Sequence, residues 1–410
     1  MASHGHTIDI FSETRRFERT CPSALIAAVI GVAALAAGFV MKPGGADLRQ
    51  FMNSYLLAYL FVLSISLGCL FFVLIQHVVA AGWSVVVRRL AEQIAGAMPL
   101  MALLVIPIVV FRTELYPWLN PTDEMKHLVE HKRPYLNDTF FIIRVAAYFA
   151  VWTLLSRGFL SASLRQDANG DAAISTRLRT LAAPSLILYG VTVSFAAVDF
   201  MKALSPMWFS TIFGVYWFAG CALSGFGFLA LVAMWVQGSG KLTRAITKEH
   251  YHDLGKLMFA FVVFWTYIAF SQYMLIWYAN IPEETRWYLV RQSGDWWQVS
   301  LALLLGHFCI PFVLFISRHP KRSKATLFIF AVWVLLMHWL DLFYLTRPPE
   351  APEGLLAGTG GGIPLHLLDA LCIVGVGGLF WAWVASALAR HSLVPERDPW
   401  LKESLAFENY

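Results

Sequence analysis

The chain contains ten runs of mostly apolar residues, which are separated by shorter polar stretches. A helix that crosses a bilayer needs about 20 such residues. None of the runs shows the alternation of apolar and polar positions that is typical of a membrane β-barrel. The pattern therefore predicts an all-α polytopic membrane protein with spans at 22–41, 52–81, 94–112, 138–160, 178–199, 209–236, 254–279, 296–318, 323–345 and 362–389.

The amino-acid composition also indicates a membrane protein. Of the 410 residues, 58% are hydrophobic and only 14% are charged, whereas soluble domains average about 25% charged residues. An ordinary soluble enzyme is therefore excluded. The net charge of +5 is small and its basic residues are spread over loops, so no nucleic-acid partner is expected. The five cysteines lack the short spacings of a metal or iron–sulfur site, so no metal centre is expected either.

Lys and Arg are more frequent in the loops on the side of the N-terminus, for example in segment 318–324. The positive-inside rule then places both termini in the cytoplasm. We expect a cytoplasmic tail at 1–21, a transmembrane domain at 22–389 and a second tail at 390–410. The longest outer loop, 113–137, is too short to be a domain.

Charged side chains inside a bilayer are costly, so each of them is a functional hypothesis. The ninth and tenth spans each carry a His-x-x-Asp sequence, whose spacing places both side chains on one helix face. If these consecutive spans pack as neighbours, the four groups converge near the outer surface and can pass protons. The candidates for proton handling or quinone contact are Glu114, Arg144, Asp199, His338, Asp341, His366 and Asp369.

Structural roles remain open for several of these groups. Asp369 lies in the first turn of its helix, where it complements the helix dipole. Arg144 must pair with an acidic group, for which Asp341, Asp369 and Glu114 are the candidates, and a structural ion pair explains it as well as an active site does. Asp199 lies near a span end, from which it can reach the headgroups.

The cytoplasmic half of the spans holds few ionisable groups, so a proton path through it would need hydroxyl groups. Tyr189 and Thr192 on the fifth span and Tyr267 on the seventh have usable spacing, with His307 near the middle of the eighth. Hydroxyls in membrane helices more often bond their own backbone or a neighbouring helix. His307, alone on an apolar span, is also expected as a hydrogen-bonded core histidine.

The seventh span ends in interleaved polar and aromatic residues, followed by a proline that stops the helix. Its polar members are Tyr278, Asn280, Glu283, Glu284 and Arg286. We call these five residues the outer motif. They predict a shaped surface that docks another protein.

The outer motif, together with the sequence Tyr135-Leu-Asn-Asp-Thr-Phe-Phe-Ile-Ile-Arg144 that enters the fourth span, resembles a known family. It is similar to the ActF membrane subunits of alternative complex III, a bacterial quinol:electron-acceptor oxidoreductase. These belong to the wider NrfD-like, polysulfide-reductase-type membrane subunits. The resemblance implies two four-helix bundles with a helix added at each flank, in the bacterial inner membrane.

The resemblance also implies a function in electron transport in a respiratory chain. The chain would be a subunit that supports quinol oxidation or proton translocation at the outer side and has no redox centre of its own. Its partners would be a homologous NrfD-like membrane subunit, an iron–sulfur subunit and multihaem cytochrome c subunits, and quinone or menaquinone its only small ligand besides lipid. Two alternatives stay open: a secondary ion or solute transporter, and a haem-b subunit ligated by His338 and His366.

Overall fold

The computed structural model of the chain describes residues 22–41, 47–347 and 363–409, so the tail expected at 1–21 lies outside the described residues. Within these ranges, ten helical segments are long and apolar enough to cross a membrane, and no β-strand is present. The predicted all-α polytopic fold is therefore confirmed.

Eight spans are single helices and two are composite. The single ones are α2 (Pro22–Met41), α3 (Leu48–Val78), α9 (Asp138–Asn169), α10 (Ala173–Phe200), α11 (Phe213–Gly238), α12 (Lys248–Ala279), α17 (Lys324–Thr346) and α18 (Leu367–Arg390). The third span joins η2 (Gly82–Ser84), α4 (Val85–Ala95), α5 (Met98–Leu104) and α6 (Ile106–Val110), and the eighth joins α14 (Trp296–Ala302), the π-helix η5 (Leu303–Cys309) and α15 (Ile310–Phe315).

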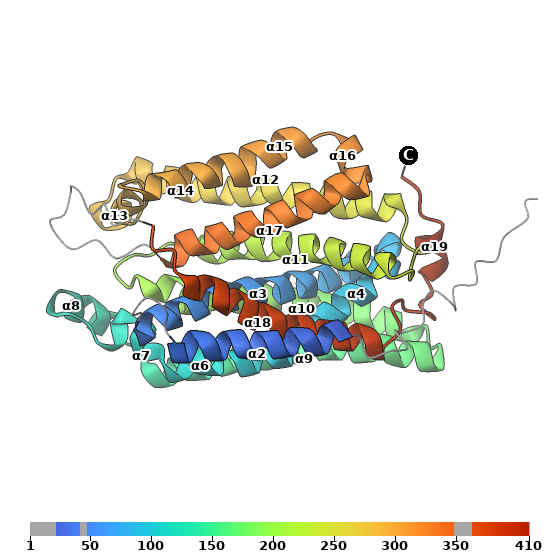
Figure 1. Cartoon of the computed structure of the whole chain (residues 1–410), viewed down its shortest axis with the longest axis horizontal. Coiled ribbons are helices and arrows are strands. Elements are labelled where there is room, and N and C mark those ends of the chain that lie inside the picture. Colours follow the sequence, from blue (N-terminus) through green and yellow to red (C-terminus); the bar gives the residue numbers. More distant parts are fainter. Residues whose placement is uncertain (1–21, 42–46, 348–362, 410) are drawn as a thin grey trace, which may run out of the picture.

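Short helices cap the two ends of the bundle. Figure 1 shows α7 (Arg112–Leu115), α8 (Asp123–His131) and α13 (Pro282–Arg291) at one end, which we call the α13 end. The opposite end, which we call the α19 end, carries α16 (Arg318–Arg322) and α19 (Leu401–Leu405). The remaining helical elements are two short 3-10 helices, η3 (Pro117–Leu119) and η4 (Lys202–Leu204).

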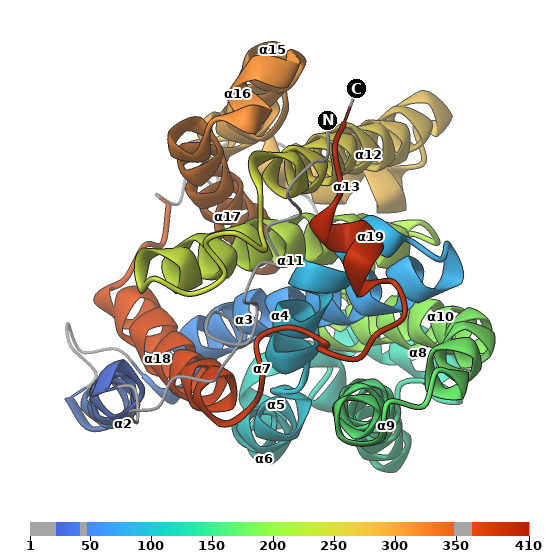
Figure 2. The same ribbon diagram turned by 90° about the vertical axis from the view of Figure 1, so that its right-hand side faces the viewer.

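The view along the bundle places α3 and α11 in its centre (Figure 2). The first group of spans packs around α3 and contains the third span, α9 and α10, while the second packs around α11 and contains α12, the eighth span and α17. Helices α2 and α18 pack against each other along α3. The two added helices therefore share one flank, whereas the resemblance implied one at each flank.

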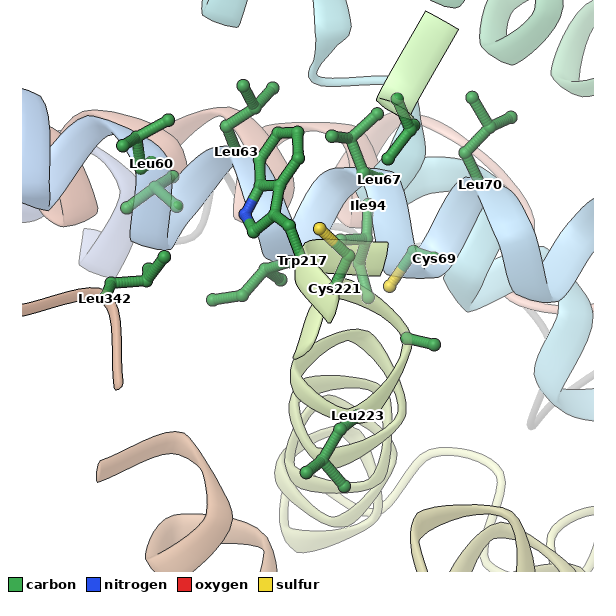
Figure 3. Packing of buried hydrophobic residues seen from close by; sticks show 14 of the residues in the cluster. Leu60, Leu63, Leu67, Cys69, Leu70, Ile94, Trp217, Cys221, Leu223 and Leu342 are labelled. Carbon is green, nitrogen blue, oxygen red and sulfur yellow. The ribbon is translucent and has the colours of Figure 1, made fainter. Parts of the chain in front are cut away.

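Helices α3 and α11 touch backbone to backbone where two glycines meet. A Cβ atom at Gly225 would lie 2.5 Å from the carbonyl carbon of Gly68, and one at Gly68 would overlap the carbonyl oxygen of Cys221. Small residues allow membrane helices to approach this closely, and van der Waals packing then holds them. Figure 3 shows buried apolar side chains of the two helices in this region, among them Cys69 of α3 and Cys221 of α11.

Replacing Gly68 with Ala is expected to lower the free energy of unfolding by about 1–3 kcal/mol, because the added methyl group must push the two central helices apart. Gly190→Ala is the matched control, since a Cβ atom there meets nothing within 4 Å. Detergent unfolding followed by circular dichroism measures both. Equal stability of the two variants would contradict the close contact.

The C-terminal segment is packed rather than free. Leu393 and Val394 are fully buried. The Ser404 hydroxyl donates a hydrogen bond to the Trp83 carbonyl (2.6 Å) and accepts one from the Val86 amide (3.2 Å). The segment expected as a cytoplasmic tail at 390–410 thus closes the α19 end through residue 409.

Candidate functional site

The outer candidates do not converge on one point. Helix α17 packs on α3, α11 and α12, whereas α18 packs on α2, α3 and α4. The expectation that these consecutive spans are direct neighbours is therefore wrong. The charged candidates instead occupy three separate places in the bundle.

The first place is an ion pair between α9 and α10. Arg144 donates two hydrogen bonds to Asp199, from Nε to Oδ2 (2.8 Å) and from Nη2 to Oδ1 (2.7 Å), and a third to the Tyr135 carbonyl (2.9 Å). Tyr148 also donates to Asp199 (2.7 Å). The predicted carboxylate partner of Arg144 is confirmed, but it is Asp199 and none of the three candidates. Glu114 lies partly exposed on α7 and does not take part.

These partners complete the hydrogen bonding of the Asp199 carboxylate. Asp199 is therefore bound within the bundle and does not reach the headgroups. The Asp199 carboxylate is thus the counter-charge of the buried Arg144 guanidinium. The pair is best understood as a clasp that joins α9 to α10.

The second place lies where α18 begins. Arg347, just beyond α17, pairs with Asp369 and donates to the Ser54 hydroxyl (3.0 Å). His366 is the N-cap of α18: its Nδ1 accepts from the Leu368 amide (3.2 Å), while Asp369 accepts from the His366 amide (3.0 Å). The predicted position of Asp369 in the first turn of its helix is confirmed, and the capping bond and the ion pair are additional to it.

The third place contains Asp341, which is 1% exposed. Its Oδ1 accepts a hydrogen bond from the Tyr216 hydroxyl of α11 (2.6 Å), and its Oδ2 accepts one from the Trp265 indole of α12 (3.1 Å). No basic side chain of the described residues forms an ion pair with it. A buried carboxylate with only neutral donors can gain a proton at lower cost than one held by a guanidinium.

Tyr216 and Trp265 are also walls of a cavity of about 620 Å3. Its other walls come from α12, α13, α14, η5, α15 and the end of α17, and most of them are aromatic or aliphatic. Small-molecule sites have volumes of about 300–1,000 Å3 and few polar groups. Tyr267, Phe270 and Leu304 line it as well and are 64%, 58% and 53% exposed, so the cavity opens on the side that faces lipid.

His307 lies beside this cavity in the π-helix η5. Its ring stacks on Trp265 (centroids 3.9 Å apart), and neither ring nitrogen has a hydrogen-bond partner among the described residues. The expectation of a hydrogen-bonded core histidine is therefore wrong. Pro311, which lacks an N–H group, interrupts the helix here, and the Trp333 indole bonds the Gly306 carbonyl (2.7 Å). Such π-segments are frequent at functional sites.

His338, one turn from Asp341 on α17, faces α3 and not the cavity. Its Nε2 lies 2.9 Å from the Ser64 hydroxyl of α3, and its Nδ1 has no partner among the described residues. The ring fits only because residue 220 is a glycine, where a Cβ atom would lie 2.5 Å from it. His366 caps α18 instead of facing His338, so the pair does not offer two opposed haem ligands.

The sequence interpretation missed Gln272, which lines the cavity, and Arg291, which stacks on the Trp287 wall from outside the lining. Gln272 donates to the Tyr288 hydroxyl (2.9 Å). Arg291, at the end of α13, is 2% exposed and donates to the carbonyls of Trp287, Tyr344 and Leu345. Burial lowers the pKa of Arg291 to about 9, so its guanidinium is still charged at neutral pH.

The outer motif lies on the surface that roofs this cavity. Tyr278 is 83% exposed, Asn280 ends α12 in a left-handed conformation (φ 51°), and Glu283 and Glu284 start α13. Arg286 follows on the same helix. Helix α13 is held to the bundle by the stacking of Trp287 on Trp208 at 4.4 Å.

The hydroxyl groups of the expected relay mostly bond the backbone. Tyr189 donates to the Leu67 carbonyl (3.0 Å), and Thr192 donates to the Leu188 carbonyl (2.8 Å) and accepts from the Trp152 indole (2.9 Å). Tyr267 belongs to the cavity mouth and not to a path.

The α19 end is far more polar than expected. Helix α4 buries Arg88, Arg89 and Glu92. Arg89 pairs with Glu92 (3.1 Å) and with Asp167 of α9 (2.8 Å). Arg88 pairs with Asp398 of the C-terminal segment (2.5 Å). The expectation of few ionisable groups in this half is therefore wrong.

No group of three or more His, Cys, Asp or Glu side chains that could hold a metal ion occurs in the described part of the chain. No known family model matches the sequence, and no curated protein matches it. The function must therefore be inferred from Asp341 and the cavity beside it.

Proposed function

We propose that the chain is a membrane subunit of a quinol-oxidising respiratory complex of the alternative complex III type, and that the cavity between α12, α13 and η5 binds the quinol. The observation that carries this proposal is the position of Asp341. A buried carboxylate without an ion-pair partner lies one side chain behind an aromatic cavity that opens toward lipid.

The route of entry supports a lipid-soluble ligand. The mouth of the cavity is formed by Tyr267, Phe270 and Leu304 in the middle of membrane-spanning segments. An isoprenoid quinol dissolved in the bilayer reaches such a mouth directly, whereas a water-soluble solute does not. The cavity volume also suits a ring with the first part of a tail.

The Tyr216–Asp341 hydrogen bond supports the proton chemistry. When a quinol hydroxyl loses its proton to the Tyr216 oxygen, the Tyr216 proton moves along the existing 2.6 Å bond to Asp341. One electron then leaves the deprotonated quinol for an acceptor in another subunit, so this step removes one proton and one electron. Arg291 stacks on the Trp287 wall of the cavity, and its positive charge there favours a negative quinol oxygen through space.

The outer motif supplies the docking surface in this proposal. The exposed Tyr278 and Glu283 lie above the cavity, where an iron–sulfur or haem subunit must approach to accept electrons. The α13 end would then face the outside and the termini the cytoplasm of a bacterial cell, as the loop charges predict.

Ala269→Trp is the test variant, because Ala269 lines the cavity on α12, where an indole would fill it, and Asp341 is not part of the lining. We expect photolabelling of the full-length chain by an azido-quinone to fall at least about tenfold, as exclusion of the headgroup predicts. In the assembled complex, Asp341→Asn should keep the label but lose quinol oxidation on the order of a hundredfold.

Ile187→Trp is the control for Ala269→Trp, since residue 187 is a lipid-facing position on α10 that is 71% exposed. The azido-quinone should label this variant as strongly as it labels the unmodified chain. Equal labelling of Ala269→Trp and Ile187→Trp, or label spread evenly over the lipid-facing helices, would refute quinol binding in this cavity.

A further inference from the structure

A second, basic pocket of about 320 Å3 lies at the α13 end, between the segment that precedes α9 and the end of α10. Its lining includes His131, Lys132 and Lys202 and contains no acidic residue. It shares no residue with the cavity assigned to the quinol. Its volume is within the range of small-ligand sites, about 300–1,000 Å3.

Lys202 supplies a charge that no described residue neutralises. It is partly buried in η4, and its ammonium group forms no hydrogen bond or ion pair with another described residue. The ammonium group of Lys132, which donates to the Pro206 carbonyl (2.7 Å), lies near enough to repel it. Two like charges at one partly buried pocket are stabilised by an anion that lies between them.

An apolar surface starts at the same pocket. The Tyr135 ring, which lines the pocket, packs against Phe140 and Phe195 with centroid distances of 6.3 Å and 6.4 Å. Both phenylalanines are exposed, by 40% and 47%, and Ile143 continues the apolar surface along α9. A free phosphate ion would use only the basic groups, whereas a phospholipid would use the apolar surface as well.

We propose that this pocket binds the phosphate headgroup of an anionic phospholipid, whose acyl chains lie along α9 and α10. Lys202 and Lys132 contact the phosphate, and Phe195 and Ile143 contact the chains. The same lipid lies beside the Arg144–Asp199 clasp, since Arg144 stacks on Tyr135 at 3.9 Å. The site is independent of the quinol cavity.

The test uses the full-length chain in neutral detergent, titrated with phosphatidylglycerol, with phosphatidylcholine or with inorganic phosphate, and read by native mass spectrometry and by the unfolding midpoint. We expect saturable binding of phosphatidylglycerol and a raised midpoint. Lys202→Gln should weaken that binding about fivefold, the effect of one lysine at a membrane surface. Lys202→Arg should bind normally, and so should Lys402→Gln, an exposed change at the α19 end.

Val198→Trp is a second variant, which fills the pocket and keeps both lysines. It should also weaken phosphatidylglycerol binding, and it keeps the proposal testable if Lys202→Gln fails to fold. Unchanged phosphatidylglycerol binding in Lys202→Gln or Val198→Trp would overturn the site. Equal protection by inorganic phosphate alone, or by phosphatidylcholine, would overturn the assignment to an anionic lipid.

Discussion

Replacing Arg144 with Met is expected to lower the free energy of unfolding by about 3–5 kcal/mol, because it leaves the Asp199 carboxylate buried without its counter-charge. The side chains of the pair are only 8% and 0% exposed, so water cannot replace the guanidinium. Detergent unfolding in mixed micelles, followed by circular dichroism, measures the loss. The double variant Arg144→Met, Asp199→Asn removes both charges and keeps an acceptor for Tyr148, so it should recover most of the stability.

Arg133→Met is the control for this experiment. Its pair with Glu130 is exposed by 72% and 70%, and such surface pairs contribute only about 0–1 kcal/mol. If Arg144→Met were as mild as Arg133→Met, or if the double variant were less stable than the single one, the clasp between α9 and α10 would not be a stabilising ion pair.

The spans themselves could be predicted because the signal is strong and local. Runs of about 20 consecutive apolar residues are typical of membrane-spanning helices, and all ten predicted runs overlap helices long enough to span a membrane. The apolar pattern predicted that the third span starts at residue 94, whereas it starts at Gly82 in the structure. Helix α4 carries Arg88, Arg89 and Glu92, so its sequence is not continuously apolar. Its partners Asp167 and Asp398 are distant in sequence and could not be inferred from spacing.

The site was predicted only in part because neighbours in sequence are not always neighbours in space. The spacing of His338 and Asp341 predicted that both side chains lie on one face of a helix, and both residues do lie on α17 but contact different helices. Residues three apart on a helix still point about 60° from each other, since each residue turns the helix by about 100°. His338 therefore faces Ser64, and Asp341 faces Tyr216. The long connection after α17 lets α18 pack on α2 instead of α17.

The cavity had weaker signals in the sequence. Gly306 and Pro311 mark a break in the eighth span, which is where the π-helix brings His307 beside Trp265. The i, i+4 spacing of Trp287 and Arg291 places a cation over an aromatic ring at the outer surface, with the guanidinium 3.3 Å from the ring centre. Neither the helix break nor the stacked cation indicates a cavity until the positions of α12 and α17 in the bundle are known.

Replacing Arg89 with Met is expected to lower the free energy of unfolding by about 3–5 kcal/mol, because Asp167 then loses its guanidinium partner and Glu92 keeps only Arg88 at 3.5 Å. The Arg89 side chain is fully buried and also donates to Ser163 (2.9 Å) and Ser392 (2.7 Å). It thus joins α4 to α9 and to the C-terminal segment. Unfolding in mixed micelles should therefore begin at the α19 end, and hydrogen exchange should rise first in residues 391–409.

The triple variant Arg89→Met, Glu92→Leu, Asp167→Asn separates the two physical causes of such a loss. If the loss comes from the two carboxylates that no longer face Arg89, removing their charges restores most of the stability. If the lost hydrogen bonds to Ser163 and Ser392 cause it, the triple variant stays as unstable as the single one. Lys126→Met, whose pair with Asp123 is exposed by 65% and 94%, should change stability by less than about 1 kcal/mol. An Arg89→Met chain as stable as Lys126→Met would show that the C-terminal segment does not depend on this network.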